Sequence, residues 1–203
     1  MDMVTGLVSR MTAAVSVPIS IDLEAGYGDT SEAAAESVAK ILKAGAIGIN
    51  IEDGLFGGKR QLVSPDQHAA KIKAVRNAAQ KLGIRLFINA RTDPFLLKFG
   101  SPDECLNEAA KRANAYADGG ADGIFVPGLI DLALIEKFVQ LTRLPVNIMV
   151  TQGLPEIPDL ARVGVRRVSL GPWPMMAAMH VIGQAAAAVA ASKQYGTFLQ
   201  PNA

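Results

Sequence analysis

The chain has little of several features that mark other classes of protein. Its 203 residues include one cysteine, so no disulfide can form within the chain. The formal net charge is +1, and basic residues are interspersed with acids, so nucleic acid and anionic membranes find no positive patch. No segment of transmembrane length is free of charge and glycine, and no charged N-terminal segment precedes an apolar run. These absences predict a cytoplasmic protein that binds neither nucleic acid nor membrane.

Half of the residues are hydrophobic, which is enough for a substantial core, and the length favours one domain spanning 1–203. Strand-like and helix-like segments alternate with a period of roughly thirty residues, which is typical of βα units. Ser31 and Ser64 are predicted to begin helices. The predicted strands are 17–24, 46–52, 85–91, 122–127, 145–150 and 166–170, and the predicted helices are 4–15, 31–43, 64–81, 101–118, 131–142, 155–162 and 175–193.

Parallel strands of this kind form either an open sheet or a closed eight-stranded barrel. Six strands suit the open sheet. Polar residues on one side of several strands favour the barrel, because the centre of an open sheet is apolar on both faces. No glycine-rich phosphate turn follows the first strand either. The sequence therefore predicts an α/β fold of the TIM type, a (β/α)8 barrel with six parallel strands visible and about the first two βα units missing.

Acidic residues end the first two predicted strands. Side chains on a strand alternate between faces, so Ser20, Asp22 and Glu24 are expected to share one side. Glu52 ends the next strand with the same inward parity. Carboxylates at the end of a buried strand repel one another unless a cation lies between them, and oxygen ligands suit a divalent metal. The alternative for any single acid is a helix cap or a solvated loop residue.

Two cations lie near these acids in the predicted barrel. Arg91 ends the third strand, where its guanidinium suits a substrate carboxylate; the alternative is a buried ion pair with Asp93 or Glu52. The glycine-rich segment 54–60 contains Lys59 but lacks the phosphate-loop pattern. This segment is either a lid in which Lys59 closes over an anion or an ordinary solvated turn.

Other residues that often carry chemistry receive structural roles. Cys105 lies in a helical pattern and is predicted to be a free structural thiol, while His68 and His180 are predicted to be surface or packing residues. Trp173, between two prolines, suits packing or an interface. The alanine-rich run 184–191 is predicted to be a packed helix, too short to span a bilayer.

Four motifs resemble the isocitrate lyase/phosphoenolpyruvate mutase superfamily, in that family's order and over nearly the whole chain. They are VPISIDLEAGYG at 17–28, GINIED at 48–53, NARTD at 89–93 and RVSLGP at 167–172. The resemblance implies a barrel enzyme that binds Mg²⁺, with Mn²⁺ as an alternative, and a small 2-oxo or 2-hydroxy carboxylate. It also implies C–C or C–P bond chemistry with a metal-stabilised enolate, in a homo-oligomer (dimer or tetramer) that exchanges its last helix.

The resemblance also assigns roles to residues of this chain. It implies metal binding by Asp22, Glu24 and Glu52, with Glu52 direct or through water; substrate binding by Arg91, Asn147 and Ser20; and catalysis by Arg91 and the lid residue Lys59.

Several positions depart from the well-known members. Glu24 stands where they carry Asp, and Gly128 stands where the lyases carry an acid. Lys59 is not followed by the Cys-Gly-His of the isocitrate-type lid. Cleavage of isocitrate or methylisocitrate is therefore not expected, and the chain resembles the small mutase-like subgroup. The main alternative is an inactive or truncated member that acts as a binding or assembly subunit. A sugar-phosphate barrel is a weaker third interpretation, because the turn after the last strand is poor in glycine.

Overall fold

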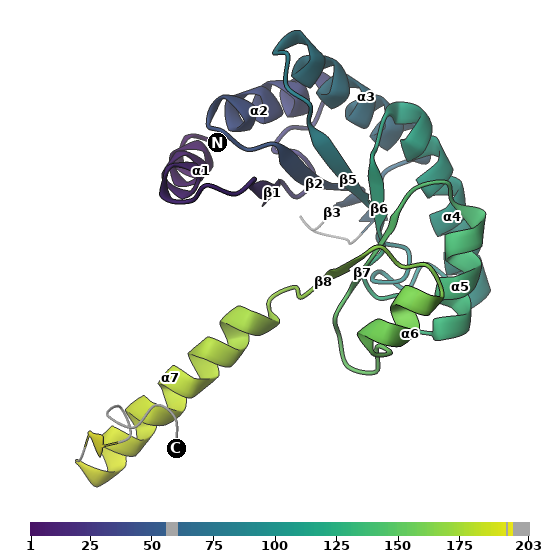
Figure 1. Cartoon of the computed structure of the whole chain (residues 1–203). Helices are drawn as coiled ribbons and strands as arrows, with labels where there is room; N and C mark the ends of the chain where they lie inside the picture. Colours follow the sequence, from purple (N-terminus) through teal and green to yellow (C-terminus); the bar gives the residue numbers. More distant parts are fainter. Residues whose placement is uncertain (56–60, 194, 197–203) are drawn as a thin grey trace. The chain divides into compact units, whose positions relative to one another are not determined.

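The computed structural model describes residues 1–55, 61–193 and 195–196 (Figure 1). The chain divides into two compact units, Met1–Val168 and Ser169–Ala203. The assignment of residues 1–203 to a single domain stays a prediction.

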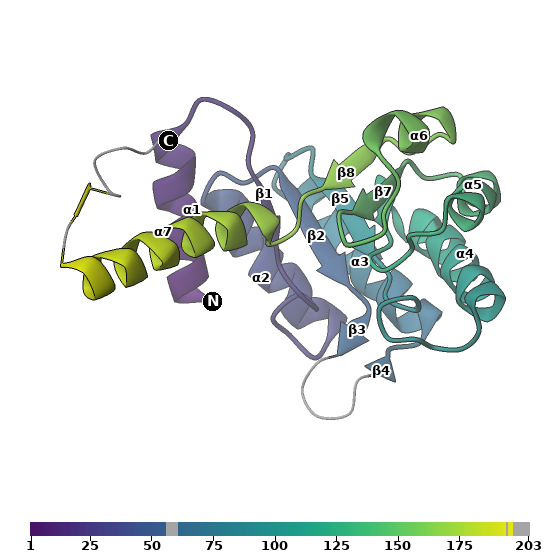
Figure 2. The same cartoon turned by 90° about the horizontal axis from the view of Figure 1, so that it is seen from below.

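A parallel sheet of six strands forms the inner layer of the first unit. Each strand lies beside the next one in sequence, which is the order that a barrel wall has and a doubly wound sheet lacks. The sheet curls into part of a barrel, with its concave side lined by strands and its convex side covered by helices (Figure 1, Figure 2). The six predicted strands are confirmed, each somewhat shorter than expected: β1 (Ser20–Asp22), β2 (Gly48–Glu52), β5 (Phe87–Arg91), β6 (Gly123–Phe125), β7 (Val146–Met149) and β8 (Arg167–Ser169).

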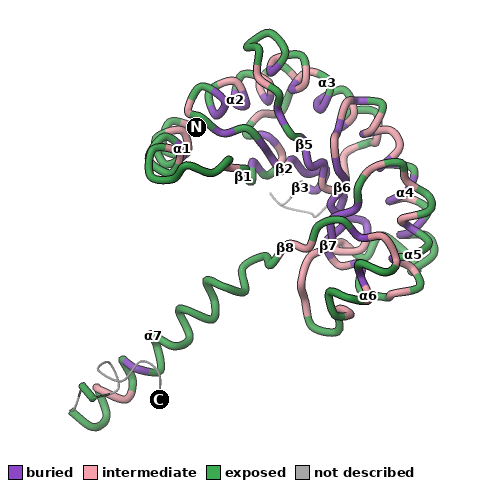
Figure 3. Tube along the Cα trace, in the orientation of Figure 1, coloured by how far each residue is buried: buried purple, intermediate pink, exposed green. Residues whose placement is uncertain are grey.

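The helices of this unit form the outer layer, and each packs against the next one along the chain. The core lies between them and the convex face of the sheet, where buried residues concentrate (Figure 3). Ile49, Ile51 and Ile88 are fully buried there, as strand alternation predicts. The helices are α1 (Asp2–Ala14), α2 (Ser31–Lys43), α3 (Pro65–Lys81), α4 (Pro102–Gly119), α5 (Leu132–Leu141) and α6 (Ile157–Arg162).

Side-chain caps mark the start of four of these helices, α2, α3, α4 and α5. Ser64 caps α3 through a reciprocal capping box with Gln67, as its sequence context predicts. The predicted start of a helix at Ser31 is confirmed, because Ser31 is the first residue of α2, and the side chain of the preceding Thr30 accepts the capping hydrogen bond.

A short antiparallel hairpin, β3 (Gly54–Leu55) with β4 (Gln61–Leu62), was not predicted from the sequence. Strands of two residues are too short for an alternating pattern, so the segment resembles a glycine-rich connection. Lys59, the predicted lid residue, lies between these strands and outside the described residues.

The second unit contains one long helix, α7 (Trp173–Ser192). The prediction of a helix here is confirmed. The alanine-rich run is the C-terminal part of this 20-residue helix, so its own short length does not limit the helix. The expectation that the run is packed is wrong, because Ala185 is the one buried residue of α7. Among the described residues, α7 is the one helix long and apolar enough, by length and composition, to cross a membrane.

Candidate active site

The strand register places two rows of polar side chains across the concave face of the sheet. Paired residues of parallel strands point to the same side, so the lower row runs from Asp22 to Asn50 and Asn89. Asn89 Nδ2 donates a hydrogen bond to Asn50 Oδ1 at 2.8 Å. The upper row, at the carboxyl ends of the strands, consists of Glu52, Arg91, Phe125 and Asn147.

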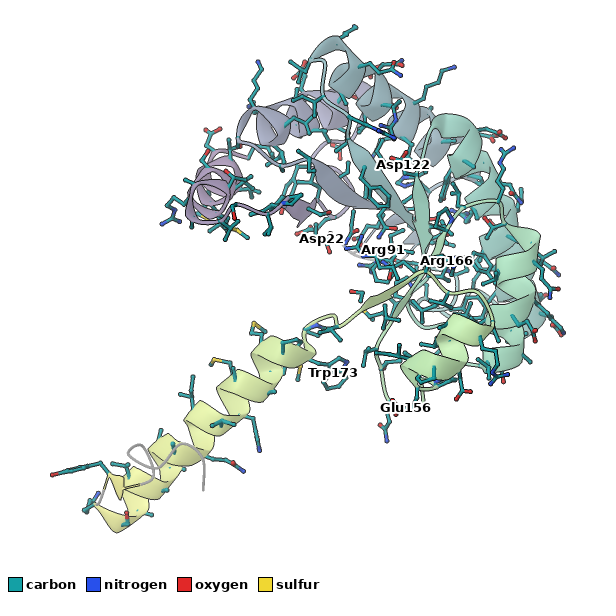
Figure 4. All side chains as sticks on the ribbon, viewed as in Figure 1. Asp22, Arg91, Asp122, Glu156, Arg166 and Trp173 are labelled. Atoms are coloured by element: carbon teal, nitrogen blue, oxygen red, sulfur yellow. The ribbon has the colours of Figure 1, made fainter. Side chains whose placement is uncertain are left out.

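Arg91 is held by two carboxylates in the upper row. Its Nη1 lies 2.7 Å from Glu52 Oε2, and its Nε and Nη2 donate to the two oxygens of Asp93 at 2.8 and 3.1 Å. Figure 4 shows Arg91 and Asp22 on the inner side of the curled sheet. The ion pair that the sequence offered as an alternative for Arg91 is therefore present. A guanidinium fixed in this way is preorganised to bind a small carboxylate.

Glu52 is buried, with one guanidinium and several acids near it. Burial raises the pKa of its carboxyl to about 7, Arg91 opposes this rise, and the charges of Asp93, Asp22 and Glu24 add to it. Its protonated and ionised forms are thus both populated near neutral pH. A cation beside it would favour the ionised form.

Glu24 reaches the site by a turn and not by strand alternation. The strand β1 ends at Asp22, and Glu24 adopts a left-handed backbone with φ of 49°. Its N–H donates to Asp22 Oδ1 at 3.1 Å, and the Tyr27 hydroxyl donates to Glu24 Oε1 at 3.2 Å. The expectation that Ser20, Asp22 and Glu24 alternate along one strand is therefore wrong for Glu24. Ser20 and Asp22 lie on β1 and are exposed.

We call the carboxyl ends of the strands the rim of the curled sheet. The acids there, Asp22, Glu24 and Glu52, suit a hard divalent cation by their chemistry. Among the described residues, no three or more His, Cys, Asp or Glu side chains are grouped so that they could hold a metal ion together. Mg²⁺, however, usually binds one or two carboxylates and keeps several waters. Asp22, Glu24 and Glu52 supply oxygen donors only, and the pKa of Glu52 is raised mainly by burial, with a further contribution from the charges of Asp93, Asp22 and Glu24. The donor set therefore fits Mg²⁺, and the assignment of these three residues as its ligands stays a prediction.

Asn147 ends the upper row with an unsatisfied group. It is 2% exposed, and its Oδ1 has no hydrogen-bond partner within the described part of the chain. Phe125 separates it from Arg91, whose guanidinium carbon lies 6.0 Å from the centre of the ring. A buried amide oxygen without a partner is costly, so a ligand at this face that donates a hydrogen bond would stabilise Asn147.

Asp53, an acid that the sequence analysis did not select, supports the rim from the side of the helix layer. Asp53 is fully buried and accepts hydrogen bonds from Thr92 Oγ1 at 2.7 Å and from the backbone N–H of Asp93 at 3.0 Å. It also accepts from Arg112 Nη1 at 3.0 Å and from the Tyr116 hydroxyl. These contacts connect the ends of β2 and β5 to α4. They fix the backbone on which the site residues lie.

The structural roles predicted for two other residues are confirmed. His68 is fully buried and packs edge-on against Tyr116, with ring centres 4.7 Å apart, and burial lowers its pKa to about 4. Cys105 is a free, buried thiol in α4. Neither side chain belongs to the rows of the concave face.

Comparison with known proteins places the chain in a family. The family model described as phosphoenolpyruvate phosphomutase matches residues 1–190. An uncharacterized protein of Mycobacterium tuberculosis (strain ATCC 25618 / H37Rv) is 36% identical over 176 residues, which cover 87% of this chain and 63% of that protein. The oxaloacetate decarboxylase of Rhodopseudomonas palustris (strain ATCC BAA-98 / CGA009) is 32% identical over 196 residues, or 90% of this chain and 62% of the enzyme. The chain thus spans about three fifths of the length of these curated relatives.

Solved structures agree with the fold. A provisionally named phosphonomutase from Burkholderia cenocepacia J2315 is 39% identical, with a TM-score of 0.86, and the match covers 95% of this chain and 76% of that one. A 2,3-dimethylmalate lyase, described as a PEP mutase/isocitrate lyase superfamily member, shares the fold with a TM-score of 0.81 at 21% identity, over 95% of this chain and 67% of that one. The chain belongs to the phosphoenolpyruvate phosphomutase family.

Proposed function

We propose that the chain carries the active site of a Mg²⁺-dependent lyase or mutase that acts on a small 2-oxo or 2-hydroxy carboxylate at a C–C or C–P bond. The observation that carries this proposal is the upper row, where the buried pair of Arg91 and Glu52 lies beside Asp22 and Glu24 on the concave face. Three acids and one guanidinium at the carboxyl ends of neighbouring strands match the place where barrel enzymes have their active sites.

Each residue of the rim contributes a distinct step. Arg91, held by Asp93, binds the substrate carboxylate, and Glu52 exchanges its pairing with Arg91 as the anion arrives. Asn147 Oδ1 accepts a hydrogen bond from the substrate or from a water beside it. Asp22, Glu24 and Glu52 would hold the metal, which supplies the positive charge that stabilises a developing enolate. The catalytic role proposed for Lys59 rests on the family resemblance alone, because this residue lies outside the part of the chain that the structure describes.

The test is binding of oxalate, a stable mimic of the enolate, measured by isothermal titration calorimetry with and without Mg²⁺. We expect oxalate to bind tightly only when Mg²⁺ is present, and Asp22→Ala to weaken Mg²⁺ binding. If Asp22→Ala leaves Mg²⁺ affinity unchanged, the metal site is misassigned. Glu32→Ala, which removes an acid from the first turn of α2, is the matched control.

Assigning the reaction class requires a turnover assay as well as a binding measurement. Oxaloacetate is the first substrate to try, because a relative of this chain is named an oxaloacetate decarboxylase. Release of pyruvate, followed with a coupled dehydrogenase, would support the lyase branch. Binding of Mg²⁺ and oxalate without turnover of any 2-oxo acid would instead favour the inactive binding or assembly subunit.

We further propose that the protein is a cytoplasmic homo-oligomer, a dimer or tetramer. Large apolar side chains are exposed along α7, including Met175, Met179 and Ile182, and such side chains are usually covered by a partner. Light scattering on the purified protein tests the oligomeric state. A monomer at micromolar concentration would contradict it.

A further inference from the structure

A lysine from α3 holds the turn that carries Glu24. Lys71 is 9% exposed, and its Nζ donates to the backbone oxygen of Ala25 at 2.7 Å and to that of Gly28 at 3.4 Å. The two oxygens belong to residues three positions apart in the turn between β1 and α2. One ammonium therefore fixes both ends of the segment from Ala25 to Gly28.

This turn has a backbone that needs such support. Glu24, Gly26 and Tyr27 all have positive φ, at 49°, 100° and 51°. Glutamate and tyrosine rarely adopt the left-handed region, and residues held there persist only where the surroundings determine the conformation. Gly26 leaves no room for another residue, because an added Cβ would meet the Ala34 Cβ at 3.0 Å.

The near end of the turn is attached to the sheet. The backbone oxygen of Glu24 accepts a hydrogen bond from the Glu52 N–H at 2.8 Å, and the Leu23 N–H donates to Asn50 at 3.1 Å. Beyond Glu24 the turn leaves β2, and the Lys71 ammonium takes over its support. The Glu24 side chain thus lies between an anchor on the sheet and an anchor on α3.

Burying the Lys71 ammonium costs desolvation free energy, which argues against a purely structural role for this residue. Burial lowers the pKa of Lys71, and the charge of Asp29 opposes this effect. An apolar side chain would fill the same volume without the cost of desolvating a charge. Lys71, Glu24 and Tyr27 also line a cavity of about 640 Å³, which gives a hydrated ion access to the turn.

We propose that Lys71 is a positioning residue of the active site, which holds the Glu24 turn in the conformation that binds a divalent cation. It acts through the oxygens of Ala25 and Gly28 and does not contact substrate itself. This inference rests on the proposed function, because it requires Glu24 to be a ligand.

The experiment compares three variants of the full chain by Mn²⁺ binding, measured by electron paramagnetic resonance. Lys71→Met keeps the length and removes the donors, Lys71→Arg keeps a cationic donor, and Lys73→Met removes an exposed lysine from the same helix. We expect Lys71→Met to weaken Mn²⁺ binding about 10- to 100-fold, the range found when a residue that supports metal ligands is removed. Lys71→Arg should recover most of this loss, and Lys73→Met should bind like the unmodified chain.

Hydrogen exchange gives a readout that needs no metal. Amides between residues 23 and 28 should exchange faster in Lys71→Met, while those of α3 stay protected. If Lys71→Met does not fold, Lys71→Gln, which keeps one uncharged donor, replaces it and should show an intermediate loss.

The outcomes separate the two proposals. If the unmodified chain binds Mn²⁺ and Lys71→Met binds it equally well, Lys71 has only a structural role and the inference is wrong, even if the melting temperature falls. If the unmodified chain does not bind Mn²⁺ at all, the proposed metal site fails, and the inference fails with it.

Discussion

Two carboxylates at the end of β2, Asp53 and Glu52, are neighbours in sequence but differ in the face they point to and in their partners. Asp53 faces the helix layer, is fully buried and accepts hydrogen bonds from four donors. Glu52 faces the concave side, where one guanidinium and three further acids surround it. Both are carboxylates on the same strand end, and both are largely shielded from water.

The difference between them shows how one strand end can serve both stability and binding. Because strand residues alternate, Asp53 and Glu52 point to opposite faces. The donors around Asp53 leave it satisfied, so it holds β2, β5 and α4 together. Glu52 has one cationic partner, Arg91, and burial together with the charges of the neighbouring acids raises its pKa to about 7, so a bound cation would favour its ionised form. Under the proposed function, Glu52 is the member of the pair that binds the metal, and Asp53 is the member that supports the fold.

The largest effect on stability is expected when Asp53, whose hydrogen bonds are all satisfied, is replaced. Asp53→Ala leaves the buried Arg112 and Tyr116 without their common partner, so we expect a loss of about 3–5 kcal/mol in the free energy of unfolding. Urea denaturation followed by far-UV circular dichroism measures it. Glu136→Ala, at an exposed acid on α5, should change stability by less than about 0.5 kcal/mol. A loss below about 1 kcal/mol for Asp53→Ala would show that the network does not support the rim.

The next test concerns the pH dependence of Glu52. Its pKa is about 7 in the folded chain against a usual 4.5, so the folded state binds more protons than the unfolded state between these values. Stability should therefore fall as pH rises from about 4.5 to 7. Glu52→Gln removes this term, so its stability relative to the unmodified chain should rise by about 1–3 kcal/mol between pH 5 and pH 8. Urea denaturation in EDTA at both pH values measures this difference. A difference that does not change with pH would contradict the assignment.

The sequence predicts the residues at the rim better than it predicts the buried network around Asp53 that supports them. Asp22, Glu52 and Arg91 could be found because each ends a strand, and strand ends of one parity meet at one edge of a barrel. The place of Glu24 could not, since alternation assumes an extended backbone and this residue is left-handed. Arg112 carries no local signal, because it lies 59 residues from Asp53 in the chain.

A smaller effect is expected at the unsatisfied amide of the upper row. Asn147→Leu replaces a buried oxygen that has no partner among the described residues, so the chain without ligand should gain up to about 1 kcal/mol of stability. Oxalate should bind this variant several-fold more weakly in the presence of Mg²⁺, as calorimetry can measure. Weaker folding with unchanged oxalate affinity would show that Asn147 is a core residue and not part of the site.

The smallest effect should come from Tyr27, which tests whether Glu24 belongs with Glu52 or with Asp53. The Tyr27 hydroxyl donates to Glu24 at 3.2 Å from an exposed position, so Tyr27→Phe should change the free energy of unfolding by less than about 0.5 kcal/mol. If Glu24 is a ligand, the same change frees its carboxylate and should weaken Mn²⁺ binding about two- to threefold, the equivalent of roughly 0.5 kcal/mol, because this exposed hydrogen bond helps to orient the carboxylate only weakly. A loss of stability without any change in Mn²⁺ affinity would place Glu24, like Asp53, among the acids that serve the fold.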